Sequence, residues 1–349
     1  MDWAKRLEKL LKLIQLITLR VSIVITHRDP DSISAAKGMK KLFEFFGKSV
    51  DIYYCYRKDD QGNEEIFPQT QAIINEFRLD DDFMPIELFT DEKQKDAFIV
   101  VVDAPTLNNS RLNIPVKSKP RITVDHHYQP AECGEKEDDE SWYWFEPLGA
   151  AASMVAKLLF DLKVPFSKPD AVATLLMIGI KNDTAETNSL DMSTLDYQML
   201  AELSKYHEQK QIYEIATQAV SEGFWELAAI AGKKENQRKH GTVFIASVGD
   251  ITPDNEPDHL RIVRMMQATE GVKTSHAWGL SGRYLIIKSR NDNKEVDLNK
   301  VLAVFGEVNG GSKANAGGIV MDLGPIGETK NRAAFHEAVW RWLEEKLIH

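Results

Sequence analysis

Two short apolar runs that end in acidic and imidazole side chains constrain the fold more than any other feature of the sequence. Residues 97–105 read AFIVVVDAP, and residues 120–127 read PRITVDHH. Their apolar parts are short and rich in β-branched residues, which predicts buried strands rather than helices. Near-continuous apolar strands are typical of parallel sheets that helices cover on both faces, so these runs indicate an α/β fold.

Helical patterns lie between the expected strands. A strand expected at 20–26 is followed by a helix at 34–47, which Gly47 closes, and then by a further strand at 49–56. Later helices are expected at 148–162, 171–180 and 193–206, with a polar loop at 181–190 between the last two. Strands interleaved with helices predict a parallel sheet in an N-terminal domain.

The length of 349 residues predicts more than one domain. A charge-rich helical stretch separates the expected parallel sheet from a region in which strands and helices alternate again. We therefore expect an N-terminal domain at 1–205, a helical connector at 206–240 and a smaller α/β domain at 241–349.

Composition excludes several classes of protein. The net charge of −10 argues against a broad basic surface for duplex nucleic acid. Two cysteines, Cys55 and Cys133, form no disulfide framework and fit a reducing compartment, so a cytoplasmic location is expected. No apolar run has membrane-spanning length. The stretch at 3–17 is expected to be a docked amphipathic helix and a candidate homodimer contact, with attachment to a membrane surface as the minor alternative.

Polar residues follow the predicted strands and helices at places that should converge. In parallel α/β sheets ligands bind outside the carboxyl ends of the strands. Clustered carboxylates repel one another unless a cation binds between them, and carboxylates mixed with imidazoles suit Mn²⁺ or a similar ion. Two ions would activate a water for attack at phosphorus. The candidate residues are His27, Asp29, Asp31, Asp103, Asp125, His126, His127 and Asp183.

These motifs resemble the DHH phosphoesterase family, and in particular its branch with a C-terminal DHH-associated domain, which contains oligoribonucleases and 3′-phosphoadenosine 5′-phosphate phosphatases. The similarity covers nearly the whole chain, and its motifs occur in the family's order. They are ITHRDPDSISAA at 25–36, VVVDAP at 100–105, DHH at 125–127, GIKNDTAETNSL at 179–190, KSRN at 288–291 and NGGSKANAGG at 309–318.

The resemblance implies a catalytic N-terminal domain with two Mn²⁺ ions, for which Mg²⁺ or Co²⁺ could substitute. Asp103 would bridge both ions, and His126 and Asp183 would complete the coordination of one of them. His127 would contact the scissile phosphate or assist the leaving group, with Asp125 as a supporting residue.

The first motif departs from the family pattern H-x-x-P-D-x-D, and two alignments are open. Alignment from His27 places Ile33 where the second aspartate belongs, so that one metal would be weakly held. Alignment from DPDSISAA keeps both carboxylates, as Asp29 and Asp31, and brings His27 two residues closer to them. We prefer the second alignment, in which His27 coordinates differently or not at all.

The second domain carries a candidate substrate-binding loop. Relatives have a GGGH-type stretch, where this chain has Ser312 and Lys313 near the usual histidine. Glycines permit close approach of the backbone to a ligand, and their amides can donate to a phosphate. Arg290 could clamp a terminal phosphate. The candidate substrate-binding residues are Arg290, Gly310, Gly311, Ser312, Lys313 and Gly317.

The sequence thus predicts a manganese-dependent phosphoesterase that converts short single-stranded oligoribonucleotides, or linear or cyclic dinucleotides, to mononucleotides. A cleft between the two domains would admit a short substrate and exclude duplexes. Three alternatives remain. They are a 3′-phosphoadenosine 5′-phosphate phosphatase, an exopolyphosphatase-like enzyme, for which Lys288, Arg290 and Lys313 are few cations, and a catalytically impaired nucleotide-binding regulator.

Overall fold

The computed structural model divides into two compact units, Met1–Gln218 and Ala219–His349, each described here by itself. The expected three-part division with boundaries at 205 and 240 stays a prediction. The structure describes residues 2–56, 64, 66, 68–105, 107, 116, 119–127, 137–184, 192–216, 222–252, 255–293, 295–306, 309–312 and 316–348.

A six-stranded parallel sheet forms the centre of the first unit, in the order β3-β2-β1-β4-β5-β6. The predicted parallel α/β architecture is therefore confirmed. The chain order changes direction at β1, which lies between β2 and β4, and such a position is where α/β proteins bind ligands. The strands are β1 (Arg20–Ile25), β2 (Val50–Tyr54), β3 (Phe83–Pro85), β4 (Ala97–Val102), β5 (Ile122–Asp125) and β6 (Trp142–Phe145).

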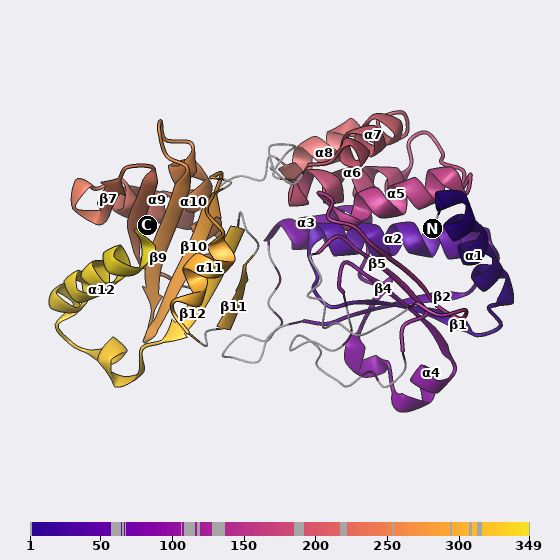
Figure 1. Cartoon of the computed structure of the whole chain (residues 1–349), viewed down its shortest axis with the longest axis horizontal. Coiled ribbons are helices and arrows are strands. Elements are labelled where there is room, and N and C mark those ends of the chain that lie inside the picture. The colour runs from indigo at the N-terminus through magenta and orange to yellow at the C-terminus, as the bar shows by residue number, and fades with distance from the viewer. Residues whose placement is uncertain are drawn as a thin grey trace. The chain divides into compact units, whose positions relative to one another are not determined.

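Helices cover both faces of this sheet. Figure 1 shows α2, α5 and α6 stacked over one face, with α4 on the opposite face. The N-terminal helix α1 is amphipathic as expected and buries Leu10, Leu13 and Ile14. The helices are α1 (Trp3–Leu16), α2 (Pro30–Phe45), α3 (Pro68–Phe77), α4 (Asp91–Lys95), α5 (Ala151–Asp161), α6 (Ala171–Asp183), α7 (Thr194–Leu203) and α8 (Gln209–Ala216).

Several elements of the first unit differ from expectation, among them helices α3 and α4, which were not predicted. Strands β3 and β6 were not predicted, because each has four residues or fewer and lacks a β-branched run. Helix α6 was expected to end at Ile180, but it continues to Asp183, since no proline or glycine interrupts Lys181–Asp183. Asp183 therefore lies in the last turn of a helix and not in the following loop.

The second unit is a smaller α/β domain, as predicted. Its sheet has the order β11-β12-β10-β9-β8-β7, in which only β8 and β9 pair in parallel. Helices α9 and α10 pack on one face, and α11 and α12 pack on the other. The strands are β7 (Gln237–His240), β8 (Val243–Asp250), β9 (Thr274–Ser281), β10 (Tyr284–Asn291), β11 (Asn309–Ser312) and β12 (Ala316–Asp322). The helices are α9 (Glu222–Ala231), α10 (Glu256–Gln267), α11 (Leu298–Ala303) and α12 (Arg332–Leu347).

The glycine-rich stretch forms strands where a loop was expected. Gly310 and Gly311 lie in β11, which pairs antiparallel with β12, and Gly317 pairs with Ser312. Glycine lowers strand propensity but keeps both backbone hydrogen-bonding groups, so pairing at the sheet edge remains available to it. Lys313 lies outside the described residues.

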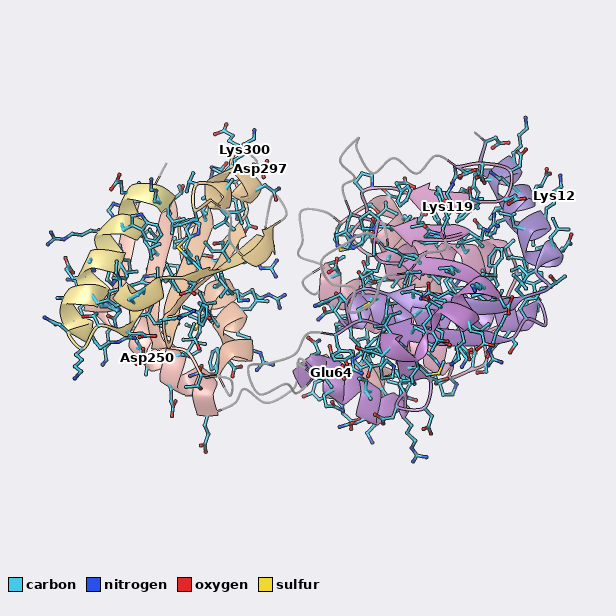
Figure 2. All side chains as sticks on the ribbon, turned by 90° about the horizontal axis from the view of Figure 1, so that it is seen from below. Lys12, Glu64, Lys119, Asp250, Asp297 and Lys300 are labelled. Carbon is cyan, nitrogen blue, oxygen red and sulfur yellow. The ribbon has the colours of Figure 1, made fainter. Side chains whose placement is uncertain are left out.

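Charged side chains of both signs project from the two units. Figure 2 shows Lys12 and Lys119 at the surface of the first unit, and Asp250 and Lys300 at the surface of the second. Among the helices of the described residues, none is long and apolar enough to span a bilayer.

The three helices that lead to the strand ends cross very closely. A methyl group at Gly179 of α6 would lie 2.8 Å from Cβ of Ser34 in α2 and 3.1 Å from Cβ of Ala152 in α5. Gly179→Ala should therefore lower the free energy of unfolding by about 1–3 kcal/mol through overpacking, as measured by urea denaturation. Unchanged stability would show that the helices can separate at this crossing without cost.

Candidate metal centre

The centre of the candidate site is the imidazole of His126, one residue beyond β5. Its side chain is buried, and Nδ1 donates a hydrogen bond of 2.9 Å to the backbone carbonyl of Leu148. That bond leaves Nε2 facing three carboxylates. Nε2 lies 3.3 Å from Asp103 Oδ1, 3.3 Å from Asp183 Oδ2 and 3.7 Å from Asp31 Oδ2.

Asp103 reaches this cluster from the end of the neighbouring strand, β4. Its amide donates to the carbonyl of Val124 in β5, which holds the two strand ends together. The φ angle of Asp103 is 56°, a left-handed conformation that few residues other than glycine adopt and that concentrates at functional sites. Asp103 is buried, and its Oδ1 makes no hydrogen bond.

Asp31 is held by the start of another helix. The N-cap residue of α5, Ala150, has no side chain that could satisfy the free amides there. Asp31 in α2 does so instead, because its two carboxylate oxygens accept from the amides of Ala151 and Ala152 at 2.8 and 2.9 Å. Charge-assisted bonds at a helix N-terminus stabilise the carboxylate and fix its orientation.

His127 and Asp125 form a separate pair beside the cluster. The Nδ1–H of His127 donates to Asp125 Oδ1 at 2.7 Å, and Nδ1 lies 3.6 Å from Asp103 Oδ1. Asp125 is fully buried, whereas the side chain of His127 is 33% exposed. His127 can therefore contact a ligand from solvent while Asp125 fixes its ring.

The first-motif residues divide between two arrangements. Asp29 caps α2 by accepting from the amide of Ser32 at 2.9 Å, and its other oxygen accepts from His27 Nδ1 at 3.0 Å. Asp31 joins the cluster around His126, whereas Ile33 is fully buried in the hydrophobic core. Asp31, and not Ile33, thus supplies the second carboxylate of this segment.

The charges in the cluster shift the proton affinities of its members. Burial raises the pKa of Asp31, and the charges of Asp103 and Asp183 raise it further. Burial and the charge of Asp29 likewise raise the pKa of Asp103. Burial lowers the pKa of His126, but the close carboxylates of Asp103, Asp183 and Asp31 outweigh it and raise that pKa to about 10.

Asp29 behaves in the opposite way. Burial raises the pKa of its carboxyl group, but the hydrogen bond and charge of His27 and the bond from the amide of Ser32 more than offset this. The pKa of Asp29 consequently lies well below its usual range. One carboxylate of the first motif is thus satisfied within its own segment, and the other faces the cluster.

The residues present fit a divalent cation. Nε2 of His126 and Oδ1 of Asp103 are buried, face each other and make no hydrogen bond, although buried polar atoms are nearly always paired. A proton on His126 and a metal ion are alternative ways to neutralise the surrounding carboxylates. Two groups of three residues could each hold an ion, because the possible ligand atoms within each group lie within 4.8 Å of one another. One group is Asp103, His126 and His127, and the other is Asp31, His126 and Asp183.

Several groups that build the site were not predicted. The carbonyl of Leu148 orients His126, and the amides of Ala151 and Ala152 orient Asp31. These are backbone atoms, and because nearly every residue type supplies them, the sequence does not indicate their role. The only sequence signal is the run of small residues at Gly149–Ala152, which lets α5 begin close to α2 and α6.

The substrate-binding candidates lie in the second unit. Arg290 is in β10, where it pairs with Ser275 of β9 and with Ala316 of β12. Gly310, Gly311 and Ser312 form β11, and Gly317 begins the pairing of β12 with β11. The structure brings Arg290 and Gly317 into neighbouring strands, and the side chain of Ser312 and all of Lys313 lie outside the described residues.

Comparison with known proteins shows what this chain is similar to in sequence and in fold. Residues 22–180 match the model of the DHH family, N-terminal domain. An uncharacterized protein of Methanocaldococcus jannaschii is 25% identical over 330 residues, covering 93% of this chain and 63% of that protein, so the chain spans less than two thirds of this relative. The solved structure of an exopolyphosphatase-related protein from Bacteroides fragilis has a TM-score of 0.72 at 17% identity, over 99% of this chain and 98% of that one. The structural likeness concerns the fold.

The buried cluster predicts a specific effect on metal binding. Asp103→Asn should weaken the affinity for Mn²⁺ by more than about tenfold, since it removes a charge that faces His126 Nε2. Isothermal titration with MnCl₂ measures this. Asp82→Asn is the matched control, because Asp82 pairs with Lys37 and Lys40 away from the cluster and its loss should leave the affinity unchanged. Equal affinities for all three proteins would contradict the site.

Proposed function

We propose that this chain, whose residues 22–180 match the model of the DHH family, N-terminal domain, hydrolyses short oligoribonucleotides or linear dinucleotides with Mn²⁺. The observation that carries the proposal is the buried group of carboxylates around His126 Nε2, at the carboxyl ends of β1, β4 and β5. Such a group is costly without a cation and suits chemistry at phosphorus with one.

The residues that would hold a divalent ion in this proposal are Asp31, Asp103, His126 and Asp183. Asp29 and His27 complete the set for a second ion, in keeping with the alignment that retains both carboxylates of the first motif. Ile33 supports that alignment, because it packs in the core and cannot take the place of a ligand. When bound, two divalent ions supply a polarised water and stabilise the charge that develops on the phosphate.

The residues of the chain have separate tasks in this proposal. His126 presents Nε2 to the metal because Nδ1–H is held by the carbonyl of Leu148. His127 contacts the scissile phosphate, and Asp125 holds its ring through Nδ1. The oxygen of a water would bond to phosphorus as the bond to the ester oxygen breaks, and the proton that the water loses would be delivered to that leaving oxygen, which releases a mononucleotide.

We assign phosphate binding in the second unit to Lys288 and Arg290, with the amides of the paired glycine strands. These two cations alternate with Ser289 along β10 and so lie on one face of the sheet. Their neighbours in register are small, namely Ala277 and Gly318 beside Lys288 and Ser275 and Ala316 beside Arg290. A Cβ at position 318 would lie 3.0 Å from Lys288 Cδ, so glycine there leaves room for that side chain.

Inorganic polyphosphate is the second candidate substrate. The observation in its favour is the fold shared with the exopolyphosphatase-related protein over nearly the whole of both chains. The two cations on the β10 face are few for a long polyanion, which favours a short nucleotide with one or two phosphates.

Product analysis distinguishes these substrates. The purified protein with Mn²⁺ should convert linear diadenylate and a short single-stranded RNA to mononucleotides, with less turnover of 3′-phosphoadenosine 5′-phosphate and polyphosphate. Chromatography of each reaction measures the products. Phosphate release from polyphosphate alone would select the second candidate, and turnover of none of the four despite bound Mn²⁺ would indicate a nucleotide-binding regulator.

Two variants and a chelator serve as controls for this assay. EDTA and Asp103→Ala should both reduce turnover to background, because each removes the metal centre. His127→Ala should also lose turnover yet retain Mn²⁺ affinity, since His127 is assigned to the scissile phosphate while Asp31, Asp103, His126 and Asp183 remain to hold the metal. Full activity of His127→Ala would contradict the role given to this residue.

A further inference from the structure

One backbone segment, residues 148–152, contacts two of the proposed metal ligands and the residue next to a third. Its first carbonyl accepts from His126, and its last two amides donate to Asp31. Gly149 lies against Thr184, the residue after Asp183, because a Cβ at 149 would come 2.6 Å from Thr184 Cγ2. The segment therefore orients two ligands, His126 and Asp31, and packs beside the end of α6 that carries a third.

Asp196 holds this segment in place. Its Oδ2 accepts a hydrogen bond of 3.0 Å from the amide of Gly149, which lies between the carbonyl that orients His126 and the amides that orient Asp31. Asp196 is fully buried in α7, 47 residues away in the sequence. The same Oδ2 accepts from the amide and hydroxyl of Ser193, at 2.7 Å each, so the carboxylate has a fixed orientation.

The residue type at position 149 fits this contact. An added Cβ would lie 2.8 Å from Asp196 Oδ2 and 3.0 Å from Asp196 Cγ, distances that no side chain could occupy without moving the carboxylate. A glycine is therefore required for Asp196 to reach the backbone here. Asp196 therefore does more than cap α7, because its carboxylate also binds the amide of Gly149 in the segment behind the proposed metal site.

We propose that Asp196 is a positioning residue for the metal centre, acting through the amide of Gly149 on His126 and Asp31. This rests on the metal ligands assigned in the proposed function. Groups behind the ligands of a metal site commonly change metal affinity by 10- to 100-fold when they are removed. Asp196 touches none of the ligands, so its effect is transmitted through the Leu148–Ala152 backbone.

The test measures Mn²⁺ affinity by isothermal titration on the full chain, with thermal melting in EDTA as the readout of folding. Asp196→Ala should weaken Mn²⁺ binding by about tenfold or more. Asp196→Asn keeps an oxygen that can accept from Gly149 and should bind Mn²⁺ within about threefold of the wild type. Gly149→Ala should weaken Mn²⁺ binding as Asp196→Ala does. If Asp196→Ala does not fold, Gly149→Ala and Asp196→Asn still test the proposal.

Asp170→Ala is the matched structural control. Asp170 is also buried and caps a helix, accepting from the amides of Val172 and Ala173, but it begins α6, whose other end at Asp183 is about 18 Å away. Asp170→Ala should lower the melting temperature without weakening Mn²⁺ binding.

Two outcomes would overturn the proposal. One is wild-type Mn²⁺ affinity in a folded Asp196→Ala or Gly149→Ala variant, and the other is an equal loss of affinity in Asp170→Ala. Hydrolysis plays no part in this readout. A wild-type chain that binds Mn²⁺ but turns over no phosphate ester would refute the proposed activity and leave the role of Asp196 standing, whereas a wild-type chain that binds no Mn²⁺ would refute both.

Discussion

Electrostatic repulsion among buried carboxylates is the constraint on which the rest of the site depends. Asp31, Asp103 and Asp183 converge on one imidazole nitrogen of His126, and two of them are almost completely buried. Bringing such charges together in a low-dielectric interior is unfavourable unless a proton or a cation lies between them. Backbone hydrogen bonds fix two of these groups, the imidazole of His126 and the carboxylate of Asp31, and the proposed divalent ion would offset the repulsion.

The parallel sheet explains why residues far apart in the sequence meet there. Parallel strands end at the same edge, and β1, β4 and β5 are neighbours although their sequences are separated by a helix or a long connection. The first turn of α2, the last turn of α6 and the first turn of α5 then close around that edge, packed tightly enough that Gly179 has no room for a methyl group. The packing of these three helices therefore determines the geometry of the ligands, since a shift of α2 or α6 would move the ligand that it carries.

Strand and helix patterns were enough to predict the parallel sheet, and the polar residues after its elements included four that lie together, Asp31, Asp103, His126 and Asp183. Asp103, His126 and Asp183 meet as expected, because the edge of a parallel sheet leaves little freedom in where they lie. The backbone groups that orient these side chains could not be predicted from residue types. The carbonyl of Leu148 and the amides of Ala151 and Ala152 act through the backbone, which any residue except proline supplies in full. The extension of α6 to Asp183 and the pairing of the glycine strands were missed for a related reason. Backbone hydrogen bonds form both, and the polar residues and glycines in these segments disfavour a helix or strand only weakly.

The most direct measurement of the central claim is anomalous diffraction from crystals of the chain grown with Mn²⁺. The account predicts an anomalous peak between Nε2 of His126 and the carboxylates of Asp31, Asp103 and Asp183, with the Nδ1–H of His126 still bonded to the carbonyl of Leu148. Manganese bound elsewhere on the protein, with no peak among these four residues, would contradict the metal centre and the phosphoesterase chemistry built on it.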